Sequence, residues 1–586
     1  MPQASAVDRK QFYAPHGISG AMPEGATGIA GAWPQTLPEL LDWAVEQHAN
    51  RPALDFIGRV WTYRQLGRMV DQVAAGLQQI GVKRETRIGL CLPNVPYYVA
   101  FYFAALRLGA VVVNFNPLYT AHEISTQVRD SRTEVMVTLD LERMYRPIAS
   151  IAQESGLSRI IVCSLAAALP KMKSAFFRLL HRREIARIGR GGRHMTFDAL
   201  VALGRGKPAP RTQVGLNDLA VLQYTGGTTG VPKGAMLTHA SLIANARQLV
   251  VFAGPGTLRP GVEKVLCVLP LFHVFAMTVS MNVAIGIGAQ MILLPQFKLD
   301  DLLRTMERCK PTVFPAVPTL YGALNAAADT RKLDITSVRL CISGGAPLPL
   351  EVRMRFESLT GCRLSEGYGL SECSPVVTVN PLDGRPGRAG SAGLALPGTI
   401  IEIRDPDNPG VLLGPGERGE VCVRGPQVML GYWGRPEDTR AVMIDGALRT
   451  GDIGYVDEDG FLFLVDRIKD LIICSGYNVY PRVIEEALHA HEAVAEVIAI
   501  GVPDPYRGES PKAFVTLKPG FATTPEELLA FVAERISKIE IPRAIEIREK
   551  LPKTLIGKLS RKELVAEELL RAKAAASVSV ERGAQC

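Results

Sequence analysis

Short, almost continuous apolar runs alternate with longer runs of helical character along the first two-thirds of the chain. Strands are predicted at residues 87–92, 110–115, 134–139 and 159–163. The stretch 97–108 is predicted as a helix, because Pro96 can open it and Gly109 can end it. Strands that are apolar throughout and are separated by helices are typical of parallel sheets covered on both faces. The pattern therefore predicts an α/β fold.

The character of the chain changes after about residue 470. Before that point, strands predicted at residues 339–343 and 419–424 continue the earlier alternation less regularly; after it, short strands are predicted at 496–501 and 512–517. A helix is predicted over 525–539, because Thr524 and Glu527 stand at the spacing of a capping box and Pro525 can occupy the first helical position. The end of the chain therefore predicts a compact α+β unit of about a hundred residues, which is a common domain size.

One long uncharged stretch needs a separate interpretation. Residues 275–295 carry no charged side chain, and about twenty such residues are enough to span a bilayer. However, Gly286 and Gly288 interrupt the run, and it contains several polar residues. We therefore expect a buried helix followed by a strand at 290–294 rather than a membrane span.

Composition and cysteine usage indicate an ordinary globular protein. Of the 586 residues, 47% are hydrophobic and 21% are charged, which is typical of a chain with a large core. The ten cysteines form no CxxC pair, so neither a zinc site nor a disulfide framework is predicted. Residues 1–20 lack an apolar core, so no signal peptide is expected. These features favour a reducing cytoplasm.

Basic residues are concentrated in one segment. Residues 171–193 contain eight Lys or Arg and only Glu184 as an acid, a local balance of +7, which leaves +1 for the rest of a chain whose net charge is +8. A nucleic-acid partner is not expected, because no nucleic-acid motif accompanies this patch. Apolar residues alternate with the charges, so the segment could dock on anionic lipid at the inner face of a membrane. A solvated insertion without a partner is an equally good interpretation.

A glycine-rich loop follows the apolar run 219–223. It reads TGGTTGVPK and its key positions are Thr225, Gly226, Gly227, Thr228, Thr229, Gly230 and Lys233. Such a loop can present backbone N–H groups, hydroxyls and one cation to a phosphate chain. It is not a Walker A loop, because Gly234 rather than Ser or Thr follows the lysine. The loop resembles the phosphate loop of the adenylate-forming superfamily, and a Gly/Thr-rich surface turn is the alternative.

Two further segments resemble nucleotide-binding elements of this superfamily. The first is a tight turn after an apolar run, with Gly344, Gly345 and Ala346. The second resembles the superfamily's YGxTE element and contains Glu366, Gly367, Tyr368, Gly369, Ser371 and Glu372. The resemblance implies that Tyr368 faces adenine, Ser371 the α-phosphate, and Glu372 a Mg²⁺ ion. Mg²⁺ typically uses one or two protein carboxylates together with substrate phosphates. The alternatives are an ordinary turn and, for Glu372, a helix-capping acid.

The C-terminal landmarks extend the resemblance to residues 30–568. Asp452 and Arg467 look like the clamp on the ribose, and Lys469 occupies the hinge position. Lys558 lies in the superfamily's terminal signature and is implied to bridge the acyl carboxylate and the α-phosphate. We therefore expect a large AMP-binding domain over 30–467, with parallel or mixed sheets flanked by helices. A hinge at 466–470 and a small, mobile α+β domain over 471–568 should follow.

Within the superfamily, the segments 269–275, 427–433 and 475–481 look most like those of bacterial long-chain fatty-acid–CoA ligases. The resemblance implies that His273 borders the acyl pocket and that Gly476 and Tyr477 lie at the CoA tunnel. ATP, fatty acid and CoA would be the substrates and Mg²⁺ the metal. A medium-chain or dicarboxylate CoA ligase is the alternative enzyme. A membrane-associated fatty-acid trapping protein is an alternative of another class.

Overall fold

The computed structural model describes residues 33–189, 192–225, 232–330, 334–474, 477–504, 507–553 and 559–571. The chain forms two compact units. Unit 1 comprises Met1–Ile401 and Val423–Leu448, and unit 2 comprises Glu402–Cys422 and Arg449–Cys586. Unit 2 therefore takes in residues 402–422 and 449–467 as well as the C-terminal segment in which a separate domain was expected. The domain boundary at 466–470 stays a prediction.

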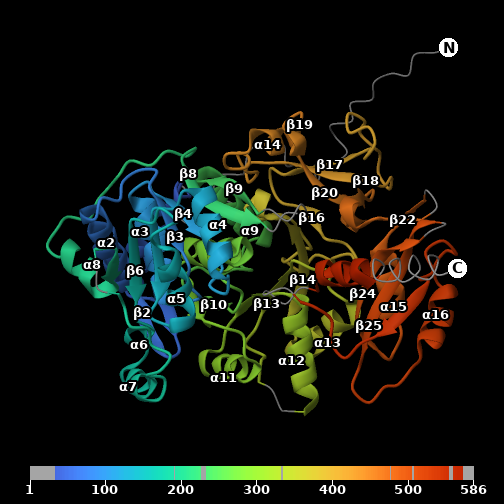
Figure 1. Ribbon diagram of the computed structural model, residues 1–586, viewed down its shortest axis with the longest axis horizontal. Helices are drawn as coiled ribbons and strands as arrows, with labels where there is room; N and C mark the ends of the chain where they lie inside the picture. The colour runs from blue at the N-terminus through green and yellow to red at the C-terminus, as the bar shows by residue number, and fades with distance from the viewer. Residues whose placement is uncertain are drawn as a thin grey trace, which may run out of the picture. The chain divides into compact units, whose positions relative to one another are not determined.

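Unit 1 contains a seven-stranded sheet with the order β7-β6-β5-β3-β4-β8-β9 (Figure 1). Its strands are β3 Arg87–Leu90, β4 Val111–Asn114, β5 Val135–Leu139, β6 Arg159–Cys163, β7 His194–Thr196, β8 Leu219–Thr225 and β9 Lys233–Thr238. Neighbouring strands are parallel except for β8 and β9, which form an antiparallel hairpin. The strands expected at 87–92, 110–115, 134–139 and 159–163 are confirmed, with ends that differ by at most two residues.

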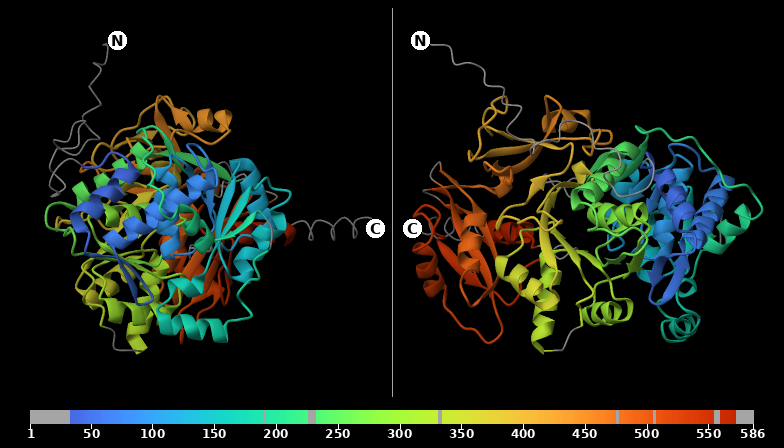
Figure 2. Two further views of the ribbon diagram at one scale, coloured as in Figure 1. Left: turned by 90° about the vertical axis from the view of Figure 1, so that its left-hand side faces the viewer. Right: turned by 180° about the vertical axis from the view of Figure 1, so that it is seen from behind.

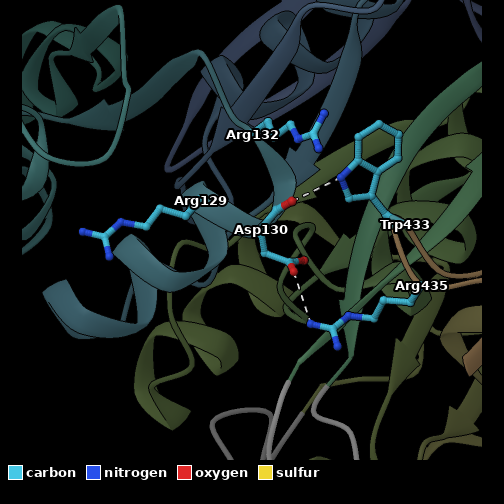
Figure 3. A pocket seen from close by; sticks show the side chains of 6 residues that line it. Arg129, Asp130, Arg132, Trp433 and Arg435 are labelled. Carbon is cyan, nitrogen blue, oxygen red and sulfur yellow. Dashed lines mark hydrogen bonds and ion pairs between the residues drawn. The ribbon is translucent and has the colours of Figure 1, made fainter.

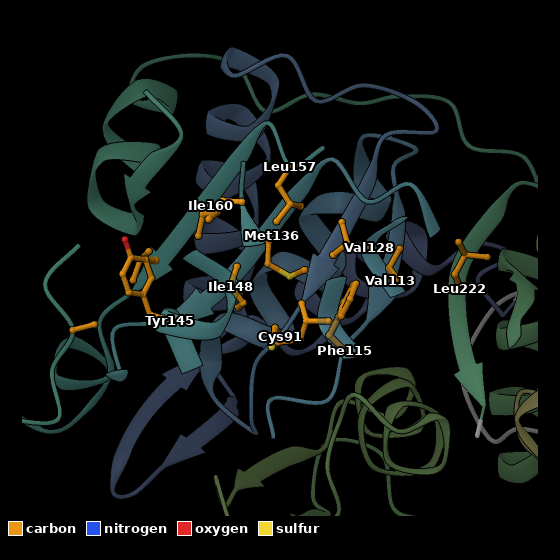
Figure 4. Close-up of a cluster of buried hydrophobic side chains, with 14 of the residues drawn as sticks. Cys91, Val113, Phe115, Val128, Met136, Tyr145, Ile148, Leu157, Ile160 and Leu222 are labelled. Atoms are coloured by element: carbon orange, nitrogen blue, oxygen red, sulfur yellow. The ribbon is translucent and has the colours of Figure 1, made fainter. Parts of the chain in front are cut away.

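Helices cover this sheet, and an apolar core fills the space between them. They are α2 Tyr63–Gln79, α3 Pro96–Arg107, α4 Ala121–Ser131, α5 Glu142–Ile151, α6 Leu165–Ala168 and α8 Phe197–Gly204, while α7 Lys171–Leu180 lies beyond α6 (Figure 1) and buries none of its side chains. All of α3 is buried, as expected for a helix between two layers. Strands β4 and β5 supply Val113 and Met136 to the core, and α4 and α5 supply Val128 and Ile148 (Figure 4).

The second sheet of unit 1 has nine strands in the order β16-β15-β14-β13-β12-β10-β11-β1-β2. Its strands are β1 Pro52–Phe56, β2 Arg59–Thr62, β10 Lys264–Cys267, β11 Gln290–Leu293, β12 Val313–Ala316, β13 Leu340–Gly344, β14 Arg363–Gly369, β15 Val376–Val379 and β16 Leu394–Ala395. The middle of the sheet is parallel and both edges are antiparallel. The remaining helices of unit 1 are α1 Leu37–His48, α9 His239–Ala253, α10 Val283–Gly286, α11 Leu299–Cys309, α12 Pro318–Thr330, α13 Leu350–Thr360 and α14 Pro436–Val442.

The uncharged stretch 275–295 forms a buried helical segment and a strand, as expected. A π-helix over Ala276–Asn282 continues into α10, and β11 follows after a short turn. The polar residues of the π-helix are buried, and Thr278 donates to the carbonyl of Ser374 at 2.5 Å. Among the residues that the structure describes, no helix is both long and apolar enough to cross a membrane.

A third sheet, of five strands, comes next along the chain. It has the order β17-β18-β20-β19, with β21 paired to β20. Its strands are β17 Ile400–Arg404, β18 Gly419–Arg424, β19 Met443–Ile444, β20 Ala447–Val456 and β21 Leu462–Arg467. The division between the two units runs through β17, β18 and β20. This sheet holds the candidate ribose residues.

The C-terminal segment folds as a small α+β layer (Figure 2). Its sheet contains β22 Ile472–Cys474, β23 Tyr477–Val479, β24 Val494–Asp504, β25 Gly508–Leu517 and β26 Ala544–Ile547, and its helices are α15 Pro481–His489 and α16 Pro525–Ala533. The capping box of Thr524 and Glu527 is confirmed. The predicted helix end at residue 539 is wrong, because Ser537 and Glu540 bond to each other in a turn that competes with the helix.

Candidate active site

The β8–β9 hairpin carries both ends of the predicted phosphate loop. Thr225 and Lys233 are direct partners across the two strands. The Thr225 hydroxyl donates to the Lys233 carbonyl at 3.4 Å. Gly226, Gly227, Thr228, Thr229 and Gly230 lie outside the described residues. The hairpin therefore fixes where the loop leaves the sheet and where it returns.

The ammonium of Lys233 lies between an acid and an aromatic ring. Its Nζ is 2.7 Å from Oδ1 of Asp438 and 5.3 Å from the ring centre of Tyr432. Asp438 belongs to the first turn of α14. A cation over an aromatic face is attracted by the ring quadrupole. Lys233 is therefore held at the mouth of the hairpin, with 19% of its side chain exposed.

Tyr432 connects the lysine to the candidate metal ligand. Its hydroxyl donates to Oε1 of Glu372 at 2.8 Å. Glu372 lies in a short 3₁₀ helix, Ser371–Cys373, directly after β14, and its carbonyl accepts from the Met429 amide at 2.7 Å. Burial and the neighbouring carboxylate of Glu372 raise the pKa of Tyr432 well above its usual range. The phenol therefore stays protonated and acts as a donor to Glu372.

A second backbone ladder places Tyr432 at this point. The Leu430 amide donates to the Met236 carbonyl at 3.0 Å, and the Trp433 amide donates to the Gly234 carbonyl at 2.8 Å. The segment around Tyr432 thus runs antiparallel to β9. Our sequence analysis did not assign a role to Tyr432 or Asp438, although it quoted the stretch 427–433. The Tyr432–Glu372 contact spans 60 residues of chain and the Asp438–Lys233 contact spans 205, which no local pattern reveals.

Two neighbouring strands bring the candidate glycines together. Gly344 at the end of β13 is paired with Gly367 on β14. A Cβ on Gly369 would lie only 2.1 Å from the Pro375 carbonyl oxygen, so no side chain fits there. Gly345 has a φ of +84°, a conformation that favours glycine. The next residue in the turn is Ala346, and Tyr368 pairs with β15.

Glu366 connects these two strands by a contact within the protein. Its carboxylate accepts from the Leu348 amide at 3.2 Å, and its carbonyl accepts from the Asn380 amide at 2.8 Å. The side chain therefore braces the loop that contains Gly345 and Ala346. This contact gives Glu366 a positioning role beside the nucleotide role that the resemblance implies.

The candidate acyl-pocket residue lies next to the same strand ends. His273 is half-buried, and its Nδ1 accepts from the Phe275 amide at 3.4 Å. The Phe275 ring lies 3.1 Å from the position of a Cβ on Gly344. The preceding carbonyl, of Phe272, accepts from the Gln223 side chain of β8 at 3.2 Å. The segment with His273 therefore lies between the carboxyl ends of β8 and β13, where ligands of open α/β sheets bind.

A cavity of about 530 Å³ opens beside Trp433 (Figure 3). It is lined by Arg129, Asp130, Arg132, Trp433, Gly434 and Arg435. Asp130 accepts from the Tyr224 hydroxyl at 2.5 Å and from Arg435 at 3.2 Å, and the Trp433 indole donates to its carbonyl at 3.2 Å. Arg435 bonds the carboxylate of this acid, whereas the Arg129 side chain extends away from it (Figure 3). Such a lining suits an anionic ligand with an aromatic part.

Unit 2 brings the two candidate ribose residues together. Asp452 on β20 and Arg467 on β21 are direct cross-strand partners, and their side chains form an ion pair of 3.0 Å. Glu420, which the sequence analysis missed, braces the turn before Asp452 by accepting from Arg449 at 2.7 Å and from the Gly451 amide at 3.2 Å. The Asp452 side chain is only 9% exposed, so its carboxylate is held in one direction.

The candidate hinge lies beside a half-buried arginine, Arg561. Lys469 is exposed on a 3₁₀ turn, and partial desolvation followed by the charge of Arg467 lowers its pKa. On either side of it in the sequence, Asp466 and Asp470 both face Arg561, at 4.0 and 3.0 Å. Arg561 also bonds Glu485 of α15 at 2.7 Å. One guanidinium therefore ties both ends of the hinge to the C-terminal layer.

Two of the predicted site residues, Lys558 and Gly476, lie outside the described residues. The backbone of Tyr477 begins β23 and pairs with Cys474. Lys553 and Leu559 form a bridge that closes the segment containing Lys558. The structure thus joins Lys233 to Glu372 within unit 1 and Asp452 to Arg467 within unit 2.

Comparisons with known proteins support this arrangement. A family model described as "AMP-binding enzyme" matches residues 41–433, and one for the "AMP-binding enzyme C-terminal domain" matches residues 483–558. The chain belongs to the AMP-binding enzyme family. The resemblance to adenylate-forming enzymes and the expected fold class, a large α/β part followed by a smaller α+β part, are confirmed.

Individual relatives cover almost the whole chain. It is 41% identical to the long-chain-fatty-acid–CoA ligase of Bacillus subtilis over 91% of this chain and 95% of that protein. It is 39% identical to the corresponding ligase of Salmonella typhimurium over 90% and 94%. Among solved structures, ATP-bound MatB from Rhodopseudomonas palustris matches with a TM-score of 0.78 and 29% identity, over 90% of this chain and 98% of that one.

Proposed function

We propose that this protein is an AMP-forming long-chain fatty-acid–CoA ligase. It converts ATP, a fatty acid and CoA into AMP, pyrophosphate and acyl-CoA. The observation that carries the proposal is the near-complete match to curated long-chain-fatty-acid–CoA ligases. The position of Tyr432 supports the proposal. Its hydroxyl bonds the candidate metal ligand Glu372, and its ring lies against the ammonium of Lys233, the phosphate-loop cation.

In the first step, a carboxylate oxygen of the fatty acid bonds to the α-phosphorus of ATP, and the bond to the β-phosphate oxygen breaks. The products are an acyl-adenylate and pyrophosphate. Two anions must approach each other, so charge neutralisation and alignment lower the barrier. We assign Lys233 to the departing pyrophosphate and Lys558 to the reacting carboxylate and α-phosphate. Asp452 and Arg467 hold the ribose, and Tyr368 lies against adenine.

Mg²⁺ is the metal we propose for this step. The Glu372 carboxylate and the Ser371 hydroxyl are both half-buried at the end of β14, and one carboxylate with substrate phosphates is an ordinary Mg²⁺ donor set. When bound, Mg²⁺ neutralises phosphate charge. Tyr432 keeps the Glu372 carboxylate in a fixed direction through its hydrogen bond. The residues present therefore fit the ion.

In the second step, the thiolate of CoA bonds to the acyl carbon and AMP leaves. We propose that the C-terminal domain, residues 471–568, rotates about Lys469 between the steps. That rotation withdraws Lys558 and brings Gly476 and Tyr477 to the thiol, a gating motion of a common kind. Arg561 pairs with Asp466 at 4.0 Å and with Asp470 at 3.0 Å, on the two sides of Lys469, so this rotation must break or stretch the longer pair.

We assign the arginine-lined cavity to the phosphates and adenine of CoA. Its guanidinium groups and the Trp433 indole suit that chemistry. Arg132→Gln should raise the KM for CoA several-fold and leave the KM for ATP unchanged. An unchanged KM for CoA would exclude this assignment and leave the ligase proposal intact.

The enzyme's substrate is sparingly soluble, so we also propose that it works peripherally at the inner face of a membrane. The support is the basic segment 171–193, whose local balance is +7. Long-chain acids partition into bilayers, and a ligase held at the surface meets them there.

The decisive experiment is AMP release by purified protein with ATP, Mg²⁺ and CoA over a panel of acids. The panel comprises acetate, octanoate, palmitate, benzoate and a medium-length dicarboxylate. We expect a maximum at palmitate. A maximum at octanoate or at the dicarboxylate would keep the mechanism and transfer the protein to the corresponding ligase class. Binding of palmitate without turnover of any acid would indicate a trapping protein instead.

A further inference from the structure

Helix α7 presents its apolar side chains to solvent. Met172, Phe176, Leu179 and Leu180 are 75%, 59%, 75% and 73% exposed. None of the ten side chains of α7, all of them described, is buried. An amphipathic helix of a globular protein normally turns its apolar face to the core. The orientation of α7 is the reverse of that rule, so its apolar face has no partner within the described part of the chain.

These four residues form one continuous stripe. Their spacings of four, three and one place them on a single side of a helix with 3.6 residues per turn. Single exposed apolar residues are common on protein surfaces, whereas a contiguous patch marks an interaction site. The stripe is therefore a surface that another apolar phase can cover.

The rest of the segment is basic. Lys173 borders the stripe, Lys171 and Arg178 lie farther round the same helix, and Arg182 and Arg183 follow it; all five are exposed. Glu184 is the only acid between residues 171 and 193, and it already pairs with His181 at 2.7 Å. An apolar stripe bordered by lysine and arginine is the combination that binds anionic lipid headgroups and acyl chains together.

Both ends of the segment are fixed to unit 1. Lys173 donates to the Ile57 carbonyl at 3.0 Å. After the helix, Ile185 bridges to Leu141, and the Ala186 amide donates to the Asp140 carbonyl at 2.8 Å. Figures 1 and 2 show α7 beyond α6, at the edge of unit 1. The stripe is thus carried on a defined support rather than on a free tail.

We infer that α7 is a lipid-docking helix whose Met172–Phe176–Leu179–Leu180 stripe inserts into an anionic membrane surface while the flanking basic residues bind its headgroups. This inference rests on the proposed peripheral location but not on the ligase activity, because lipid binding is measured without substrates. A nucleic acid would match the charges but not the apolar stripe. A second copy of the chain would match the stripe but would bring like charges together.

The test is co-sedimentation of the full-length protein with vesicles of phosphatidylglycerol and phosphatidylcholine, or of phosphatidylcholine alone. The variant is Phe176→Ser/Leu179→Ser/Leu180→Ser, which changes only exposed side chains. Leu350→Ser/Met354→Ser on α13 is the matched control, since both residues are exposed. A second variant, Arg178→Gln/Arg182→Gln/Arg183→Gln, removes charge and keeps the stripe.

We expect the wild type and the α13 control to bind the anionic vesicles. The triple-serine variant should lose about tenfold or more in partition coefficient, and the charge variant should bind less strongly and with weaker salt dependence. Equal binding of the wild type and the triple-serine variant, or no binding of the wild type, would overturn the inference. So would a wild-type dimer that becomes monomeric in the triple-serine variant. Turnover of octanoate in the absence of vesicles should be unchanged by that variant, whereas an inactive wild type would contradict the ligase proposal alone.

Discussion

The hydroxyl of Tyr432 donates to Glu372 at 2.8 Å while the ring of the same tyrosine lies 5.3 Å from the ammonium of Lys233. One buried side chain thus touches both the candidate metal ligand and the phosphate-loop cation. Its pKa is raised by burial and by Glu372, so the phenol is a donor at all physiological pH values. The two contacts can be separated by substitution, because one needs the hydroxyl and the other only the ring.

Tyr432→Phe removes the hydroxyl and keeps the ring. A lost hydrogen bond to a charged group is worth about 1.5–3 kcal/mol, so we expect the rate of acyl-adenylate formation to fall roughly tenfold to a hundredfold. The measurement is pyrophosphate release without CoA, at several Mg²⁺ concentrations. Tyr455→Phe, on the stacked Tyr455–Phe463 pair of β20 and β21, is the control. Equal rates for Tyr432→Phe and the wild type would show that Glu372 does not need this donor.

Asp438→Asn tests the competition for Lys233. In the described structure Asp438 holds the ammonium at 2.7 Å, where it competes with phosphate. A partly exposed ion pair of this kind contributes about 0.5–1 kcal/mol. Removing the Asp438 charge should therefore lower the KM for ATP about two- to fivefold. It should also slow pyrophosphate release. Arg440→Gln on the same helix is the control. A raised KM for ATP would mean that Asp438 positions Lys233 rather than competing for it.

Lys558→Ala tests the assignment of the two half-reactions. We expect acyl-adenylate formation to fall by about three orders of magnitude or more, as for loss of a charge that stabilises the transition state. Thioester formation from supplied acyl-adenylate should stay near the wild-type rate. Lys562→Ala, four residues along the chain, controls for the loss of a lysine. Equal loss of both half-reactions would refute the proposed role of Lys558.

Gly369→Ala should destabilise the end of β14. The new Cβ would lie 2.1 Å from the Pro375 carbonyl oxygen, so the strand must shift, at a cost of about 2 kcal/mol or more. Gly322→Ala in α12 is the matched control, because its Cβ would meet nothing within 4 Å; there alanine favours the helix by about 0.5–1 kcal/mol. The measurement is the midpoint of thermal unfolding, which should fall for the first variant and not for the second.

Arg561→Gln should make the stability of unit 2 depend on pH. Burial raises the pKa of Asp466 above its ordinary value of 3.8, and Arg561 opposes that rise. A carboxyl with a raised folded pKa loses stability as the pH rises from about 3.8 through that pKa, because the unfolded chain ionises first. Removing Arg561 raises the pKa of Asp466 in the folded protein further, so the loss of stability with rising pH becomes larger.

We therefore expect Arg561→Gln to unfold at a clearly lower temperature than the wild type at about pH 8 and to recover part of that difference at about pH 5. Scanning calorimetry measures both. Arg535→Gln, at an exposed residue just after α16, should show no such recovery. A deficit that is the same at both pH values would place the effect of Arg561 in packing rather than in charge.

The sequence was most informative where one local pattern decides the structure. The apolar runs predicted β6 and β18 with their observed ends, Arg159–Cys163 and Gly419–Arg424, and the Thr524 capping box predicted the start of α16. The sequence pattern did not predict where α16 ends, because the turn that Ser537 forms with Glu540 competes with helix propensity. The contacts of Tyr432, Asp438, Glu420 and Arg561 were beyond it too, since each joins segments that only the folded sheets bring together.

The cross-strand pairing of Thr225 with Lys233 has a consequence for how this enzyme can diverge. Side chains alternate between the two faces of a strand, so a slip of one residue in β9 would turn Lys233 to the opposite face, away from Asp438 and Tyr432. An insertion or deletion between residues 226 and 232 would either force that slip or change the span of the phosphate loop. During evolution this loop should therefore accept exchanges of residues more readily than any change in its length.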